Sequence, residues 1–193
     1  MLITAVSSGG LSLLNNKTAP IIAEYKAQQR ALARQEVMQS VGARSFEEAV
    51  LSDGTVFHKA YDADNNLVGY VATAYGPGYS SVIETVSGFD LDMNITGLKI
   101  TFQQETPGLG TKAVEVREGE QRPWFLQQFE GKNSLTVAVE KDRGEIDSIT
   151  GATITSRAIT NSVRELAGRI EAEVQQAGEE AVEVVPDTLE VEG

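Results

Sequence analysis

Residues 98–110, LKITFQQETPGLG, join the clearest strand pattern in the chain to a turn that contains two glycines. Leu98, Ile100 and Phe102 alternate with polar residues, and this period of two is typical of a β-strand with one buried face. We therefore expect a strand on which these three side chains face the core. The segments on either side decide what kind of sheet this strand joins.

Short alternating segments separated by turn residues lie on both sides of that strand. Residues 55–62 and 67–75 flank the turn sequence ADNN and predict one hairpin. Residues 80–90 and 95–104 predict a second strand pair. Residues 134–140, SLTVAVE, alternate in the same way, and we expect their apolar side chains to face the core as well.

Helical segments accompany these strands. Residues 20–40 are rich in Ala, Gln, Arg and Glu and predict a helix that starts at Pro20, a residue suited to a first turn. Residues 122–129, RPWFLQQF, predict a short helix or turn with two or three core aromatics. After Thr153 comes an amphipathic helix, whose apolar positions recur at spacings of three and four. These positions are Ile159, Val163, Leu166, Ile170 and Val174.

The order of these segments predicts an α+β fold, a mainly antiparallel sheet with flanking helices, because no alternation of strand and helix is present. We divide the chain into an apolar segment at 1–16, a linker helix at 17–45, the main domain at 46–177 and an acidic tail at 178–193. The segment 1–16 has two interpretations. It is either part of a membrane anchor or a short apolar helix packed on the domain.

The composition excludes several classes of function. The net charge is -12 and no basic run is present, which argues against nucleic acid as a partner. There is no cysteine, so disulfides, thiol catalysis and cysteine-ligated clusters are excluded. His58 is the single histidine, which excludes a multi-histidine metal site. We expect it on a strand, at or near the surface.

Residues 147–160, DSITGATITSRAIT, concentrate six hydroxyl side chains directly before the amphipathic helix. If that helix starts at Thr155 or Ser156, Thr153 lies just before the first turn, where free amides and the helix dipole favour a phosphate. The alternative is that Thr153, Thr155 and Ser156 are only candidates for the helix cap.

The residues around Thr153 argue for more than a cap. Gly151 and Ala152 remove bulk from the approach to the Thr153 hydroxyl, and Asp147 and Thr150 are able to hydrogen-bond within the same loop. A cap needs one hydroxyl and needs neither Asp147 nor the Gly-Ala step. The loop is therefore a candidate phosphate-binding site.

The segment ETPGLG, residues 105–110, is a second candidate for ligand contact. Its two glycines allow a ligand to approach the main chain, and Leu109 between them offers an apolar contact. The alternative is a tight turn that leaves the sheet. The pattern is not the glycine signature of a dinucleotide-binding fold.

DSITGATITSRA resembles the flavinylation motif of the FMN-binding subunits of ion-pumping redox complexes, Asp-x-x-(Ser/Thr)-Gly-Ala-Thr. ETPGLG and WFLQQFEGK, residues 124–132, are similar to two further signatures of that family. The match is closest to the G subunits of Rnf complexes, which are related to the C subunit of the sodium-pumping NADH–quinone reductase. Where the family has a glycine pair, residues 75–81, YGPGYSS, have two serines.

The resemblance implies a covalent FMN, joined through its phosphate to Thr153 by a separate FAD:protein FMN transferase. It also implies cofactor contacts from both motifs. Trp124 has two interpretations: it either shields one face of the flavin ring or belongs to the core. The implied contact residues are Asp147, Thr150, Gly151, Ala152, Glu105, Thr106, Leu109, Gly110 and Trp124.

The implied function is electron transfer within a membrane-bound, ion-translocating ferredoxin:NAD oxidoreductase complex. The other membrane subunits are the implied partners, and a single N-terminal anchor would place the FMN domain on the extracytoplasmic side of the plasma membrane. Two alternatives are a free-standing extracytoplasmic FMN carrier and a non-catalytic scaffold subunit. A hydrolase is disfavoured because the sequence contains no paired-carboxylate signature.

Overall fold

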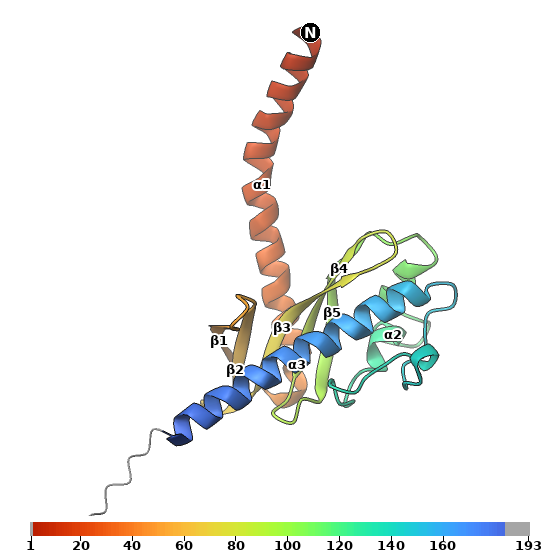
Figure 1. Ribbon diagram of the computed structural model, residues 1–193. Coiled ribbons are helices and arrows are strands. Elements are labelled where there is room, and N and C mark those ends of the chain that lie inside the picture. Colours follow the sequence, from red (N-terminus) through yellow and green to blue (C-terminus); the bar gives the residue numbers. More distant parts are fainter. Residues whose placement is uncertain (1, 184–193) are drawn as a thin grey trace, which may run out of the picture.

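The computed structural model describes the backbone of residues 2–183 and the side-chain surroundings of residues 17–176. Its centre is a five-stranded antiparallel sheet in the order β1-β2-β3-β4-β5, so each strand lies beside its neighbour in sequence (Figure 1). The predicted antiparallel α+β fold is confirmed. The strands are β1 (Ser45–Val50), β2 (Val56–Tyr61), β3 (Leu67–Pro77), β4 (Val82–Phe89) and β5 (Ile95–Phe102).

Two long helices cover opposite faces of this sheet (Figure 1). The helix α3 (Thr153–Glu183) crosses one face, while the C-terminal part of α1 (Leu2–Val37) packs against the other face at β4 and β5. The rest of α1 extends away from the body. Short helices complete the described chain: η1 (Gln39–Val41), η2 (Gly110–Val114), α2 (Trp124–Gln127) and η3 (Glu140–Asp142).

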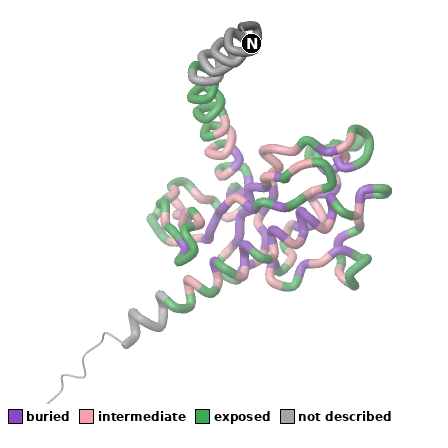
Figure 2. The backbone as a smooth tube through the Cα atoms, turned by 45° about the horizontal axis from the view of Figure 1, so that its top comes forward, coloured by how far each residue is buried: buried purple, intermediate pink, exposed green. Residues whose placement is uncertain are grey.

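The larger core lies between the sheet, α3 and the segments around α2. Phe125 and Phe129 are fully buried there and meet edge to face, with their ring centroids 5.5 Å apart. The predicted stripe of α3 is confirmed, since its first four positions are fully buried and Val174 packs against the same core. Buried segments therefore alternate with exposed ones along the domain (Figure 2).

The predicted direction of Leu98 and Ile100 is confirmed, but that of Phe102 is wrong. Leu98 is buried in the larger core and Ile100 packs against it. The register between β4 and β5 then shifts, so that Phe102 lies opposite Glu84. Directly opposed residues share a face, and Glu84 faces α1, where it accepts a 2.9 Å hydrogen bond from Arg30. One irregularity in the ladder therefore turns Phe102 toward α1, which alternation alone does not reveal.

The expected strand at 134–140 does not form. Val137 and Val139 are buried, as expected, but Val139 makes only an isolated bridge to Ile146. The segment otherwise forms turns, such as the hydrogen bond from the Val137 amide to the Asn133 carbonyl. Alternation thus identified the side chains that enter the core. A strand also needs a neighbouring strand with free backbone groups to pair with, and alternation does not show whether one is present.

One strand and two helix boundaries differ from the sequence predictions. The strand β1, Ser45–Val50, was not predicted, because its sequence SFEEAV is short and its apolar residues do not alternate with polar ones. The helix α1 starts at Leu2 and runs through Pro20, so the predicted start at Pro20 is wrong. The helix α3 continues to Glu183, and the remaining acidic tail, residues 184–193, lies outside the described residues.

The predicted anchor at 1–16 falls where side chains are not described. Among the described residues, no helix combines the length and hydropathy needed to cross a membrane. His58 lies half-buried on β2, as expected, and its Nε2 lies 2.8 Å from Arg34 Nη1. Burial and the neighbouring Arg34 lower the pKa of His58, so its imidazole is neutral at pH 7.

Candidate cofactor-binding site

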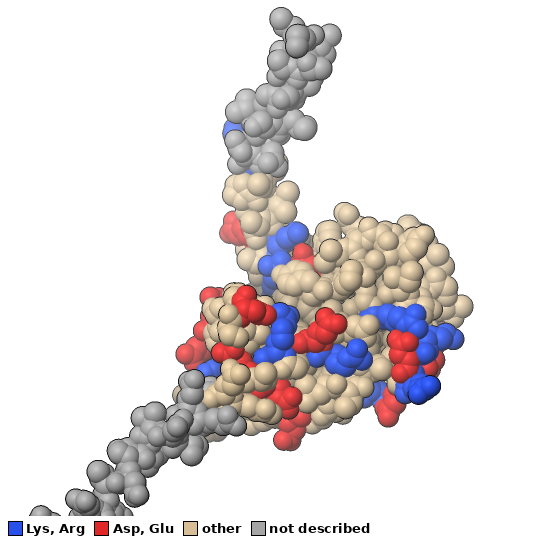
Figure 3. Space-filling model, in the orientation of Figure 1, with Lys and Arg blue, Asp and Glu red and all other residues tan. Residues whose placement is uncertain are grey.

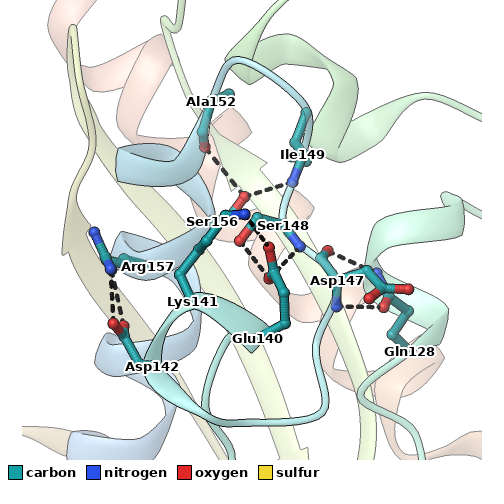
Figure 4. Close-up of polar contacts among 10 residues, drawn as sticks. All are labelled: Gln128, Glu140, Lys141, Asp142, Asp147, Ser148, Ile149, Ala152, Ser156 and Arg157. Carbon is teal, nitrogen blue, oxygen red and sulfur yellow. Dashed lines mark hydrogen bonds and ion pairs between the residues drawn. The ribbon is translucent and has the colours of Figure 1, made fainter.

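The loop that precedes α3 is held from below by two side chains of the neighbouring segments (Figure 4). Gln128 accepts a 2.8 Å hydrogen bond from the Asp147 amide and donates a 3.3 Å bond to the Asp147 carbonyl. Glu140 Oε2 accepts hydrogen bonds from both the amide and the hydroxyl of Ser148, each 2.7 Å long. The main chain at Asp147 is thus fixed, while its side chain stays exposed.

Ser156 closes the same loop from inside α3 (Figure 4). Its buried hydroxyl accepts a 2.9 Å hydrogen bond from the Ile149 amide and donates a 3.1 Å bond to the Ala152 carbonyl one turn earlier. Gly151 has φ of 78° between these anchors, a conformation that favours glycine. Ser156 therefore links the loop to the helix through these two hydrogen bonds. The interpretation of Ser156 as a helix cap is wrong.

Ser156→Ala is expected to lower the free energy of unfolding by about 1–3 kcal/mol, because it leaves the Ile149 amide buried without an acceptor. Urea unfolding followed by circular dichroism measures the change. Ser40→Ala is the control, since the Ser40 hydroxyl makes only an exposed 3.4 Å contact with the Thr96 carbonyl. Equal loss in both variants would contradict the role of Ser156.

The first turn of α3 presents free amides. The Ser156 amide donates to the Ala152 carbonyl at 3.0 Å, which is the first bond of the helix. The amides of Thr153, Ile154 and Thr155 therefore have no intrahelical acceptor. Thr153 is the first helical residue. It therefore lies in the first turn, whereas the sequence predicted a position just before that turn. Its side chain is half-buried.

Glu105 connects this helix start to the end of the sheet. The residue is 5% exposed, and its carboxylate accepts a 2.5 Å hydrogen bond from the Thr155 hydroxyl. It also accepts three backbone hydrogen bonds of 3.0–3.1 Å from the amides of Tyr79, Ser80 and Ser81. Thr155, expected as a cap, instead joins the two motifs that are fifty residues apart in sequence.

The pKa of Glu105 reflects two opposing causes. Burial raises the pKa, but the hydrogen bonds from the Thr155 hydroxyl and from the amides of Ser80, Tyr79 and Ser81 lower it more, so it lies below the ordinary value of 4.5. The side chain is therefore ionised at neutral pH. Hydrogen-bond donors balance its charge, and no Lys or Arg among the described residues forms a salt bridge with it.

A pH effect on stability follows from this lowered pKa. The contribution of Glu105 is fully present above its unfolded pKa and is lost as the pH falls through its folded pKa, below 4.5. We expect Glu105→Gln to be less stable than the wild type at pH 7, with the difference shrinking toward pH 3. Urea unfolding of both chains at several pH values measures this. A difference that stays constant with pH would contradict it.

Two glycines make room for this carboxylate. A Cβ on Gly78 would lie 2.6 Å from Glu105 Oε1, and a Cβ on Gly110 would lie 2.7 Å from the Glu105 Cβ and 2.8 Å from the Thr155 hydroxyl. Gly110 in the ETPGLG segment thus permits close packing around Glu105. Gly108 has φ of 75° and an open Cβ position, so it serves the turn itself.

A cavity of about 680 Å³ lies where the two motifs meet. The structure brings together seven of the ten predicted site residues on its wall: Glu105, Thr106, Leu109, Gly110, Gly151, Ala152 and Thr153. Three lining residues were not predicted as contacts, namely Tyr79, Ile154 and Thr155. An aromatic residue beside two serines and a glycine, as in YGPGYSS, was the available signal for Tyr79.

The other three predicted residues do not line the cavity. Asp147 and Thr150 are exposed on the loop that leads to it. Trp124 packs against the larger core and carries the Arg117 guanidinium over its ring, 3.9 Å from the ring centroid. The implied role of Trp124 in covering a flavin ring thus finds no support in its position.

The mouth of the cavity combines apolar side chains with an uncharged surface. Tyr79, Leu109 and Ile154 are exposed by 71%, 42% and 52% although they are large and apolar. In the view of Figure 3, the surface over the end of the sheet where β3 connects to β4 shows no charged side chain, whereas charges crowd the lower part of the body. This setting suits a flat, largely apolar group, with a phosphate at the helix start.

The residues present therefore fit FMN. The volume is within the usual range for ligand cavities, the three free amides suit a phosphate, and the wall around Leu109 and Tyr79 suits a flavin ring. A larger cavity of about 770 Å³ is lined by residues of α1, α3 and the strands β1, β2 and β3. It contains none of the motif residues, and its lining includes Arg30, Arg34 and Arg169.

Comparison with known proteins agrees with this geometry. The FMN-binding domain family matches residues 78–168, a range that contains both motifs. The G subunit of the Na(+)-translocating ferredoxin:NAD(+) oxidoreductase complex of Acetobacterium woodii is 34% identical over 180 residues, 83% of each chain. The G subunit of the ion-translocating oxidoreductase complex of Escherichia coli is 35% identical over 173 residues, 84% of each chain.

The chain belongs to the G-subunit family of ion-translocating oxidoreductase complexes. The crystal structure of the C subunit of the Na(+)-translocating NADH-quinone reductase from Parabacteroides distasonis has a fold similar to that of this chain. Its TM-score is 0.53 at 20% sequence identity, with 76% of this chain and 93% of that chain covered. The family resemblance inferred from the three motifs is therefore confirmed, together with the fold.

Proposed function

We propose that this G-family chain is an electron-transfer subunit of a membrane-bound, ion-translocating ferredoxin:NAD oxidoreductase complex, and that it carries FMN bound through a phosphoester to Thr153. The observation that carries the proposal is the position of Thr153. Its hydroxyl belongs to the first turn of α3, on the wall of a cavity shared by both motifs. The bound flavin supplies the electron chemistry.

The attachment balances as a transfer of FMN from FAD. The Thr153 oxygen forms a bond to the phosphorus of the FMN half, the pyrophosphate bond of FAD breaks, AMP leaves, and the hydroxyl proton is released. A separate FAD:protein FMN transferase performs this step, so Thr153 acts as acceptor. The resulting phosphodiester keeps one negative charge, which the free amides at Thr153, Ile154 and Thr155 would stabilise.

The surroundings of the cavity support the rest of the proposal. Leu109 and Tyr79 offer apolar contacts to the ring, while Gly151 and Ala152 leave the approach to Thr153 open. The uncharged surface near the mouth would let another protein of the complex approach closely enough for electron transfer. We place the chain at the plasma membrane, with the FMN domain on the extracytoplasmic side and the other membrane subunits as partners.

Intact mass after co-expression tests the proposal. The full chain is produced with and without an FAD:protein FMN transferase and supplied with magnesium. We expect a mass gain of one FMN moiety, flavin fluorescence that survives denaturing electrophoresis, and a modified peptide that contains Thr153. An unmodified wild-type chain in the presence of an active transferase would contradict the covalent cofactor and favour the scaffold alternative.

A further inference from the structure

The 78–81 turn forms one side of the candidate cofactor cavity through Tyr79. It joins β3 to β4, and its own bond, from the Gly78 amide to the Ser81 carbonyl at 2.9 Å, closes the turn. The amides of Tyr79, Ser80 and Ser81 all point to Glu105. The backbone that carries the Tyr79 ring is therefore held by Glu105, a residue of the ETPGLG segment.

The Glu105 carboxylate has no capacity left for a ligand. Oε1 accepts from the Ser80 amide and from the amide and hydroxyl of Ser81 at 3.0, 3.0 and 3.3 Å. Oε2 accepts from the Tyr79 amide at 3.1 Å and from the Thr155 hydroxyl at 2.5 Å. A carboxylate offers about four lone-pair sites, and these contacts use them. Both carboxylate oxygens are therefore engaged by donors of the protein itself.

We propose that Glu105 is a positioning residue that locks the 78–81 turn, and with it Tyr79, onto the first turn of α3, so that the cavity keeps its shape before the cofactor arrives. Thr155 is the link on the helix side, and Gly78 and Gly110 give the carboxylate its space. The inference rests on the proposed function, because it concerns the same cavity.

The charge of Glu105 has a second consequence. It is a fixed negative charge on the cavity wall, and no salt bridge to Glu105 occurs among the described residues. Reduction adds negative charge to a bound flavin, and a fixed anion in a poorly solvated wall opposes that addition. We therefore expect the midpoint potential of an attached FMN to be lower than it would be beside a neutral side chain.

Amide hydrogen exchange of the full chain without cofactor tests the positioning role directly. We expect Glu105→Ala to speed exchange at Tyr79, Ser80 and Ser81 by at least about tenfold relative to the core amide of Val86, since each tenfold corresponds to about 1.4 kcal/mol. Glu105→Gln keeps the shape and one acceptor oxygen, so it is expected to give a smaller increase, and it remains informative should the alanine variant unfold.

Glu118→Gln is the matched control, because Glu118 is exposed and lines no part of the cavity. It is expected to leave exchange at the three amides unchanged. Unchanged exchange in Glu105→Gln and Glu105→Ala alike would overturn the positioning role. This measurement needs no flavin, so it can succeed or fail whether or not Thr153 carries FMN.

The potential of the flavinylated chain provides the readout that a purely structural role would not move. Wild type, Glu105→Gln and Glu118→Gln are compared at equal flavin content. We expect a higher midpoint potential and stronger quenching of flavin fluorescence by iodide in Glu105→Gln, with Glu118→Gln like the wild type. A potential equal to the wild type in Glu105→Gln would refute the electrostatic part, and unchanged quenching would refute the preset cavity.

Discussion

Thr153→Ala is expected to remove all covalent flavin from the chain, because the substitution deletes the oxygen that forms the phosphoester. Thr153→Ser keeps that oxygen and is expected to retain part of the label. Flavin fluorescence after denaturing electrophoresis and intact mass measure both results, with each variant co-produced with the transferase. The expected contrast is between no label in alanine and detectable label in serine.

The neighbouring hydroxyl of Thr155 serves as the control for this result. It is buried and bonded to Glu105 at 2.5 Å, so it is not available as an acceptor. We expect Thr155→Val to keep the covalent label even where its stability falls. Loss of label in Thr155→Val together with full labelling of Thr153→Ala would show that the acceptor hydroxyl had been misassigned.

Gly76→Ala is expected to be strongly destabilising. A Cβ on Gly76 would lie 2.4 Å from the Ala158 carbonyl oxygen and 3.0 Å from the Ser162 hydroxyl. The nearest atoms belong to the backbone of α3, which cannot rotate away, so the helix must move off β3. We expect a loss of about 3 kcal/mol, at the upper end of the usual cost of overpacking. Urea unfolding measures it.

Gly168→Ala is the matched control in the same helix. Gly168 has no neighbouring atom within 4 Å of its Cβ position, and alanine is the better helix former by roughly 0.5–1 kcal/mol. This variant is therefore expected to be as stable as the wild type or more stable. If Gly76→Ala matched Gly168→Ala in stability, the close contact between β3 and α3 would not exist in solution.

The candidate site was predictable in part because its residue types are specialised. A Gly-Ala step beside a threonine and a Gly-Leu-Gly turn are unusual enough to be found from sequence, and the structure brings both to one cavity. The sequence left Trp124 between a cofactor contact and a core position, and in the structure it packs against the core and Arg117. A motif shows which segments belong together, but it does not show the direction of each side chain.

The roles of the hydroxyls and of Glu105 were not predictable from local sequence. Thr155 and Ser156 are residue types that commonly cap helices, yet both lie inside α3 and bond to partners outside its first turn. Glu105 resembles a ligand contact until its donors are known. These roles depend on contacts between segments up to fifty residues apart, and local propensity carries no information about such contacts.

By itself, the sequence determined the antiparallel sheet and the buried stripe of α3, and it supplied the proposal of Thr153, since alternation, helical spacing and a rare motif are local properties. Only the tertiary structure decided that Phe102 turns toward α1, that 134–140 is not a strand and that Glu105 holds the 78–81 turn. Register shifts, free sheet edges and buried hydrogen bonds arise between segments. Their energies are set when the chain packs.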